Sequence, residues 1–111
     1  MGNELLGSDE AVLKFVGQSL ALLPGSSEST RSIAAADVDG DGDLDVLLGM
    51  GDSPSRVLLN AGDGTFKTSI ELPGGNQFTF SIAAADVDGD GDLDVLLGNN
   101  NSPSCVLLNA G

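Results

Sequence analysis

The chain has 111 residues, which is enough for one small domain and too few for two independent hydrophobic cores. It carries 17 acidic and 4 basic residues, and this balance argues against nucleic-acid binding through a basic patch and against docking on an anionic membrane. It contains no histidine, the commonest general base and zinc ligand, and its single cysteine, Cys105, cannot form an internal disulfide.

The N-terminal part of the chain gives few signals. Residues 1–15 have no pattern that assigns a structure, they lack the basic region of a secretory signal, and no run in the chain approaches the roughly 20 apolar residues of a membrane span. Residues 16–23 are predicted to form a β-strand, because the sequence Leu-Pro-Gly that begins at Leu23 recurs from Leu72, 49 residues later.

This predicted strand departs from its later counterpart in one respect. Leu20 and Leu22 stand where the later strand has the polar Ser69 and Glu71, so a face that is expected to contact solvent is apolar. The apolar pair indicates an interface or a shift of register by two residues, and a helix over Ala11–Leu23 is the third alternative.

A repeat of 31 residues decides the architecture. Ser32–Gly62 and Ser81–Gly111 are offset by 49 residues and are identical at 27 of 31 positions. Three of the four differences are consecutive, at residues 50–52 of the first repeat, which indicates a variable loop on a constant frame. The fourth places Cys105 where the first repeat has Arg56.

Each unit of 49 residues contains four strand-like runs separated by turn residues. The first run is rich in alanine, and the next two are apolar on both faces. The fourth alternates between apolar and polar residues, so one of its faces is expected to contact solvent. In the first unit the runs are residues 32–38, 44–48, 56–60 and 65–72. A small-residue inner strand suits a β-propeller, whose blades crowd together near the central axis. An antiparallel sandwich with a duplicated hairpin is the alternative.

The sequence therefore predicts an all-β fold, a β-propeller with two four-stranded blades in each chain. After the N-terminal segment 1–15, residues 16–62 form the first blade with an N-terminal outer strand, and residues 63–111 form the second. Two blades cannot close a ring of four to eight. We therefore expect a homo-oligomeric ring, with the trimer preferred over the tetramer and the dimer, or a longer propeller of which this chain is a part.

Each repeat contains the nine-residue acidic loop Asp-Val-Asp-Gly-Asp-Gly-Asp-Leu-Asp. Carboxylates this close repel one another unless a cation lies between them or water screens them. Calcium, which accepts six to eight oxygen ligands, fits better than magnesium or a soft metal. We predict two calcium ions per chain, held by ten aspartates. These are Asp37, Asp39, Asp41, Asp43, Asp45, Asp86, Asp88, Asp90, Asp92 and Asp94.

The spacing assigns a role to each position of the loop. The carboxylates at positions 1, 3 and 5 converge on one point, and Gly42 at position 6 permits the sharp turn. Asp43 at position 7 offers its backbone carbonyl, and Asp45 at position 9 closes the coordination sphere with its side chain. An EF-hand is excluded, because position 12 is Leu48 and not glutamate. A solvated acidic hairpin without an ion is the alternative.

Residues 33–49 and 82–98 both read IAAADVDGDGDLDVLLG and resemble FG-GAP/VCBS repeats, the blades of integrin-α-type propellers. The resemblance covers residues 32–111 well and 16–31 weakly, and the aromatic–glycine segment of the family is only loosely represented near Phe66. In that family the Asp-rich loop links two strands of a blade and binds calcium. The resemblance implies a secreted or cell-surface protein that acts in adhesion, ligand binding or sugar binding.

Three classes of function follow from these features. The leading one is a calcium-stabilised, non-catalytic scaffold for a protein or glycan ligand. A carbohydrate-binding lectin is the alternative, although the chain has no Trp or Tyr for stacking on sugars. An enzyme is not expected, because acid–base catalysis is poorly supplied without histidine; metal-assisted hydrolysis is the remaining enzymatic alternative.

Overall fold

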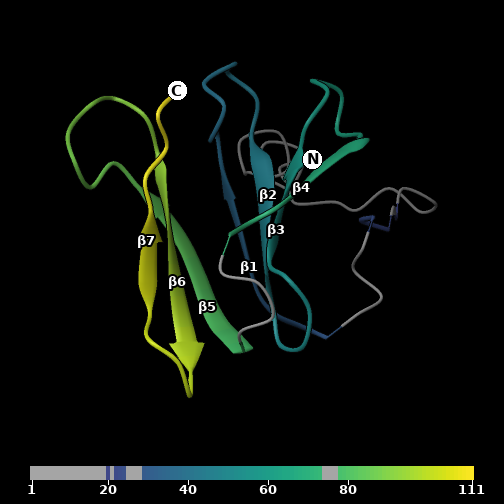
Figure 1. The fold of residues 1–111 in the computed structure, drawn as a ribbon. Helices are drawn as coiled ribbons and strands as arrows, with labels where there is room; N and C mark the ends of the chain where they lie inside the picture. Colours follow the sequence, from purple (N-terminus) through teal and green to yellow (C-terminus); the bar gives the residue numbers. More distant parts are fainter. Residues whose placement is uncertain (1–19, 21, 25–28, 74–77) are drawn as a thin grey trace, which may run out of the picture.

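The described part of the chain folds into two antiparallel β-sheets (Figure 1). The computed structural model describes residues 20, 22–24, 29–73 and 78–111. Sheet A has the strand order β1-β2-β3-β4, and sheet B has the order β5-β6-β7. The strands are β1 (Thr30–Ala36), β2 (Asp45–Met50), β3 (Arg56–Leu59), β4 (Thr68–Glu71), β5 (Phe78–Ala85), β6 (Asp94–Asn100) and β7 (Cys105–Leu107). Within these ranges the chain forms no helix, and so none that has the length and apolar character needed to cross a bilayer.

Sheet A confirms the four strands predicted for the first repeat, with one shorter than expected. The fourth begins at Thr68 and not at residue 65, because residues 61–65 close a turn of their own. The Ala61 N–H donates to the Thr65 carbonyl at 2.9 Å, and the Asp63 carboxylate accepts from the Thr65 N–H at 3.0 Å. These bonds satisfy the backbone locally and delay the strand.

The strand pairing also locates the boundary between the sheets. β4 pairs with β3, so sheet A extends beyond residue 62, where the sequence-based division placed the end of the first blade. Sheet B contains three strands among the described residues, with β7 at its edge. The predicted N-terminal segment 1–15, and most of the predicted strand over residues 16–23, lie outside the described residues.

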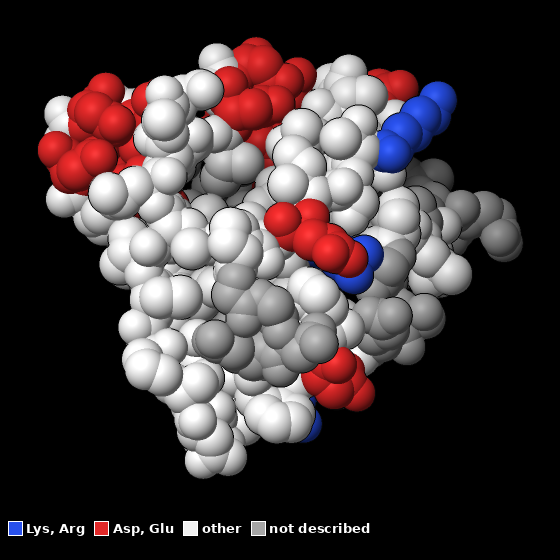
Figure 2. Space-filling view, in the orientation of Figure 1, with Lys and Arg blue, Asp and Glu red and all other residues white. Residues whose placement is uncertain are grey.

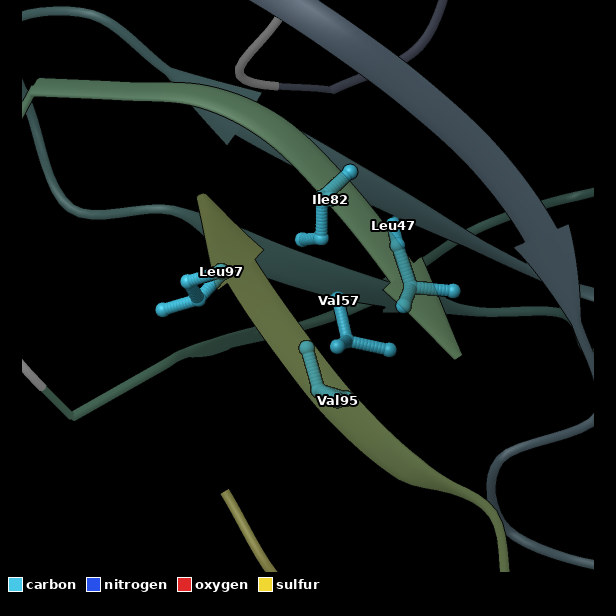
Figure 3. Close-up of a cluster of buried hydrophobic side chains, with 5 residues drawn as sticks. All are labelled: Leu47, Val57, Ile82, Val95 and Leu97. Atoms are coloured by element: carbon cyan, nitrogen blue, oxygen red, sulfur yellow. The ribbon is translucent and has the colours of Figure 1, made fainter. Parts of the chain in front are cut away.

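The two sheets pack face to face through apolar side chains. We call the face of sheet A that packs on sheet B its forward face, and the face of sheet B that packs on sheet A its rear face. The opposite faces are the rear face of sheet A and the forward face of sheet B. The forward face of sheet A contributes Leu47 and Val57, and the rear face of sheet B contributes Ile82, Val95 and Leu97. Figure 3 shows these five buried side chains meeting between the strands.

The alanine-rich strands β1 and β5 lie beside each other, as expected for the inner strands of adjacent blades. Gly49 on β2 makes this approach close: a Cβ at Gly49 would lie 3.2 Å from the Thr79 Cγ2 and 3.4 Å from the Ile82 Cβ. The Ile82 N–H donates to the Ser32 hydroxyl at 3.3 Å across the two sheets.

A second cluster lies on the rear face of sheet A. Leu48, Met50 and Leu58 are buried there, and Leu23 and Phe66 pack against them. Sheet A is therefore apolar on both faces, as the sequence predicts for its second and third strands.

The buried position of Leu47 generates a test of the packing. Replacing Leu47 by alanine removes a fully buried side chain between the sheets and is expected to lower the free energy of unfolding by about 2–5 kcal/mol in urea titrations. The control Lys67→Ala, at an exposed position, should change it by less than about 0.5 kcal/mol. Equal effects of the two substitutions would contradict the packing described here.

Candidate metal sites

Each acidic loop connects the first two strands of its sheet and folds around its first aspartate. The Asp37 Oδ1 accepts hydrogen bonds from the N–H groups of Gly40 (2.9 Å) and Asp41 (3.1 Å), and its Oδ2 accepts one from Gly42 (2.8 Å). Gly40 and Gly42 have φ angles of +75° and +94°, which glycine adopts without the strain that a Cβ brings.

The second loop repeats this arrangement around Asp86. Its Oδ1 accepts from the N–H groups of Gly89 (2.8 Å) and Asp90 (3.2 Å), and its Oδ2 accepts from Gly91 (2.9 Å). The turn that the sequence predicts at position 6 is therefore present in both repeats.

The first, third and fifth aspartates of each loop converge, as their spacing predicts. Asp37, Asp39 and Asp41 each offer a carboxylate oxygen, and these atoms lie within 4.8 Å of one another. The same holds for Asp86, Asp88 and Asp90. We call each set of three an acidic triad. Its donors are all oxygens, which suits a hard divalent cation such as calcium.

The two acidic triads lie at the same end of the molecule. Figure 2 shows the loops as two separate red clusters at the top of the view, with no blue atoms next to them on this face. No Lys or Arg occurs within residues 37–45 or 86–94 to neutralise the carboxylates. A bound cation would supply the missing positive charge.

The structure gives the aspartate at position 9 a different environment from the one predicted. Asp45 is fully buried, and its Oδ2 accepts from the Val38 N–H at 3.0 Å while its Oδ1 accepts from the Asn60 N–H at 2.9 Å. Asp94 makes the equivalent bonds with Val87 (2.9 Å) and Asn109 (2.8 Å). Neither belongs to an acidic triad. In the structure, these two carboxylates fasten the acidic loop to the end of the third strand.

The aspartate at position 7 also lies outside the acidic triads. The Asp43 N–H donates to the Asp41 Oδ1 at 2.9 Å, and its side chain approaches Gly62, where an added Cβ would lie 3.2 Å from the Asp43 Oδ2. Asp92 lies in the same way beside Gly111. That the backbone carbonyls of Asp43 and Asp92 bind the cation stays a prediction.

Two asparagines outside the predicted site residues, Asn60 and Asn109, complete the loops. The Asn60 Nδ2 donates to the Leu44 carbonyl at 2.9 Å, and its Oδ1 accepts from the N–H groups of Gly62 and Gly64. The signal was present in the sequence, because an asparagine follows Asp45 and Asp94 at the same distance along the chain in both repeats.

Asn109 also joins the two sites. Its Nδ2 donates to the Leu93 carbonyl at 2.9 Å within its own repeat and to the Val38 carbonyl at 2.7 Å in the first acidic loop. Val38 lies between two residues of the first acidic triad, so this bond holds one acidic loop against the end of the other repeat.

The hydrogen bonds within each loop shift the pKa values of its carboxyls in opposite directions. The Gly42 N–H, donated to Asp37, holds the pKa of that carboxyl below its ordinary 3.8, and Gly91 does the same for Asp86. Loss of water around Asp39, and then its hydrogen bond with Asp41, raise the pKa of Asp39 to about 6. The pKa of Asp88 is raised for the same reasons, with Asp90 as the partner.

The contrast between Asp45 and the acidic triad gives a direct test. In chelator, Asp45→Asn should lower the free energy of unfolding by about 1–3 kcal/mol, because an amide nitrogen then faces a buried N–H donor. Asp39→Asn, which removes an exposed charge, should leave the stability in chelator unchanged or higher. An unchanged denaturant midpoint for Asp45→Asn would contradict the structural role of that carboxylate.

The raised pKa values predict how stability depends on pH. The pKa of Asp39 is about 6 in the folded chain and 3.8 as a reference, so its ionisation opposes folding and the stability in chelator should fall as pH rises. Asp37 and Asp86 act in the opposite sense only at lower pH, because their pKa values lie below 3.8. Melting temperatures between about pH 4.5 and pH 7 test this, and the double variant Asp39→Asn/Asp88→Asn should give a flatter curve.

Comparison with known proteins agrees with this geometry. Searches of curated proteins and of solved structures gave no match. The family model described as FG-GAP-like repeat matches residues 37–97, more than half of the chain, from the first acidic loop to β6. This match confirms the resemblance noted in the sequence. The chain belongs to the FG-GAP-like repeat family.

Proposed function

We propose that the chain is a calcium-stabilised, non-catalytic β-propeller module that serves as a binding scaffold. The observation that carries this proposal is the pair of acidic triads, each formed by three carboxylates from one loop at the same place in each repeat. Membership of the FG-GAP-like family supports the propeller architecture.

Calcium would be held by Asp37, Asp39 and Asp41 in the first loop and by their counterparts in the second. When bound, it supplies positive charge where the like charges of the acidic triad oppose the fold. The chain itself positions the ligands: backbone N–H groups hold the Asp37 carboxylate, and Asp45 ties the loop to β3 through Asn60. A stabilising rather than a catalytic role for the ion fits this arrangement.

The lack of histidine, the side chain most often used in general acid–base catalysis, supports a binding role. Among the described residues, the two acidic triads are the carboxylate clusters that could hold a metal ion, and the proposal gives them to calcium. We propose a location outside the cell, in keeping with the family, where calcium modules bind with dissociation constants on the order of 10⁻⁴–10⁻³ M.

Calcium titration tests the proposal. Calorimetry of the chain with calcium should give two ions per chain, and Asp88→Asn should weaken one of the two sites. The melting temperature should rise with calcium and fall in chelator, since an ion at a hundred times its dissociation constant adds about 2.7 kcal/mol to the stability.

Asp52→Asn is the matched control, because Asp52 is an exposed carboxyl outside both acidic triads. It should leave both sites unchanged. Equal melting temperatures with calcium and with chelator would refute the calcium-stabilised scaffold. A response to magnesium but not to calcium would refute the identity of the ion.

A further inference from the structure

The forward face of sheet B carries the residues that sheet A buries. Four positions on the two forward faces are identical in type: Ala34 and Ala83, Ala36 and Ala85, Leu47 and Leu96, Val57 and Val106. In sheet A these side chains pack against sheet B. In sheet B, Val106 is 46% exposed and both alanines are exposed.

This open face is also hollowed. A depression of about 440 Å³ lies along β5, β6 and β7, and its lining includes Ala83, Leu96 and Val106. The same side chains on the forward face of sheet A are covered by sheet B. The forward face of sheet B is therefore suited to packing against a sheet of the same sequence.

The rear face of sheet A is the matching surface. Its residues Ile33, Ala35, Val46, Leu48 and Leu58 are the same as Ile82, Ala84, Val95, Leu97 and Leu107 on the rear face of sheet B. Ile82 is 5% exposed between the sheets, whereas Ile33 is 59% exposed and Ala35 is exposed beside it. Leu48 and Leu58 are already buried within the chain, so β1 is the part of this face that is open to a second copy. Leu23 packs on the rear face of sheet A, as Leu72, its equivalent at the offset of 49 residues, packs beside that of sheet B.

A hydrogen bond that joins the two sheets has an equivalent pair of residues at the offset of 49. Within the chain, the Asn109 side chain donates to the Val38 carbonyl. The corresponding pair is Asn60 and Val87, and Val87 is 48% exposed on sheet B. A second copy stacked in the same way would bring its Asn60 to this Val87.

The edge of sheet B offers a further match. In sheet A, β3 is covered by β4, and Arg56 lies opposite Glu71 with an ion pair of 3.9 Å. The offset of 49 residues makes Leu22 the equivalent of Glu71, and Cys105 on β7 is the equivalent of Arg56. Leu22 and Cys105 thus form an apolar pair at the two positions that carry the Arg56–Glu71 ion pair in sheet A.

The surroundings of this edge are apolar as well. A groove of about 470 Å³ lies between the sheets, lined by Leu59, Ile70 and Leu72 from sheet A and by Val95, Leu107 and Leu108 from sheet B. Leu20 and Leu22 are 84% and 86% exposed. As a strand beside β7 in the register of β4, they would point into this groove, because Ser69 and Glu71 share a face with Leu58 and Arg56.

We propose that a second copy of this chain docks on sheet B, with β1 on the rear face of its sheet A against the forward face of sheet B and its Leu20 and Leu22 along β7. The contact is heterologous, since it joins two different faces, and with the rotation between blades of a four-, six- or eight-bladed propeller its repetition closes a ring of two, three or four copies. The ring that the sequence predicts thereby acquires a specific interface. This proposal does not rest on calcium, because its faces lie outside the acidic triads.

Solution mass measurement of the full chain tests the docking. The wild type should form a discrete assembly at micromolar concentration. Val106→Glu on one face and Ile33→Glu on the other should each weaken association by about tenfold or more, because each places a charge in an apolar contact. Lys67→Glu, an exposed control with a larger change of charge, should assemble as the wild type does. A monomeric wild type at high micromolar concentration would overturn the proposal.

Mixing the two variants tests the heterologous geometry. Val106→Glu chains keep an intact rear face on sheet A, and Ile33→Glu chains keep an intact forward face on sheet B. The mixture should therefore form a heterodimer that neither variant forms alone. If Val106→Glu alone abolishes association and Ile33→Glu does not, the contact joins two copies of sheet B and the proposal is wrong.

A disulfide tests the strand pairing. Leu22→Cys should crosslink to Cys105 of a second copy under mild oxidation, since the equivalent residues Glu71 and Arg56 lie directly opposite each other. Non-reducing gels should show covalent multimers of Leu22→Cys and much less of the control Lys67→Cys. Equal crosslinking of the two variants, or a link within one chain, would overturn this register.

Discussion

A sheet that is apolar on both faces can be buried only between two neighbours, and this constraint governs the molecule. Sheet A satisfies it on its forward face, where Leu47 and Val57 meet sheet B. Sheet B satisfies it on its rear face alone among the described residues, and Val106 on its forward face stays half exposed. Repeat proteins share this property, because each unit contributes half of every interface and depends on the next unit for the remainder.

The acidic loops obey a second constraint, which is the satisfaction of backbone N–H groups in a tight turn. Each loop uses its first aspartate to accept three N–H groups and its last to accept two, so the loop shape is fixed by bonds within the chain. The repulsion that remains is concentrated at the third and fifth aspartates, where the pKa of Asp39 is raised. Bonds within the chain thus set the shape of the loop, and the cation of the proposed function would balance its charge.

The repeat made much of this predictable, because an offset of 49 residues aligned the strands and the loops without any structure. The convergence of Asp37, Asp39 and Asp41 followed from their spacing. The role of Asp45 did not, because a carboxylate that accepts two N–H groups and one that binds a cation look the same in a sequence. The late start of β4 was missed because the turn at Asp63 forms local bonds that compete with the strand. The bond from Asn109 to Val38 joins residues too distant in sequence for any local pattern to reveal.

That bond has a consequence for how tolerant each repeat is to change. Asn60 and Asn109 occupy the same place in nearly identical repeats, yet the Asn60 side chain bonds to Leu44, Gly62 and Gly64 of its own repeat, whereas the Asn109 side chain bonds to both repeats. Within one chain, loss of the Asn109 side chain would therefore loosen the contact between the repeats, whereas loss of the Asn60 side chain would leave that contact intact. The place of a repeat along the chain, and not only its sequence, therefore decides which contacts each of its residues makes.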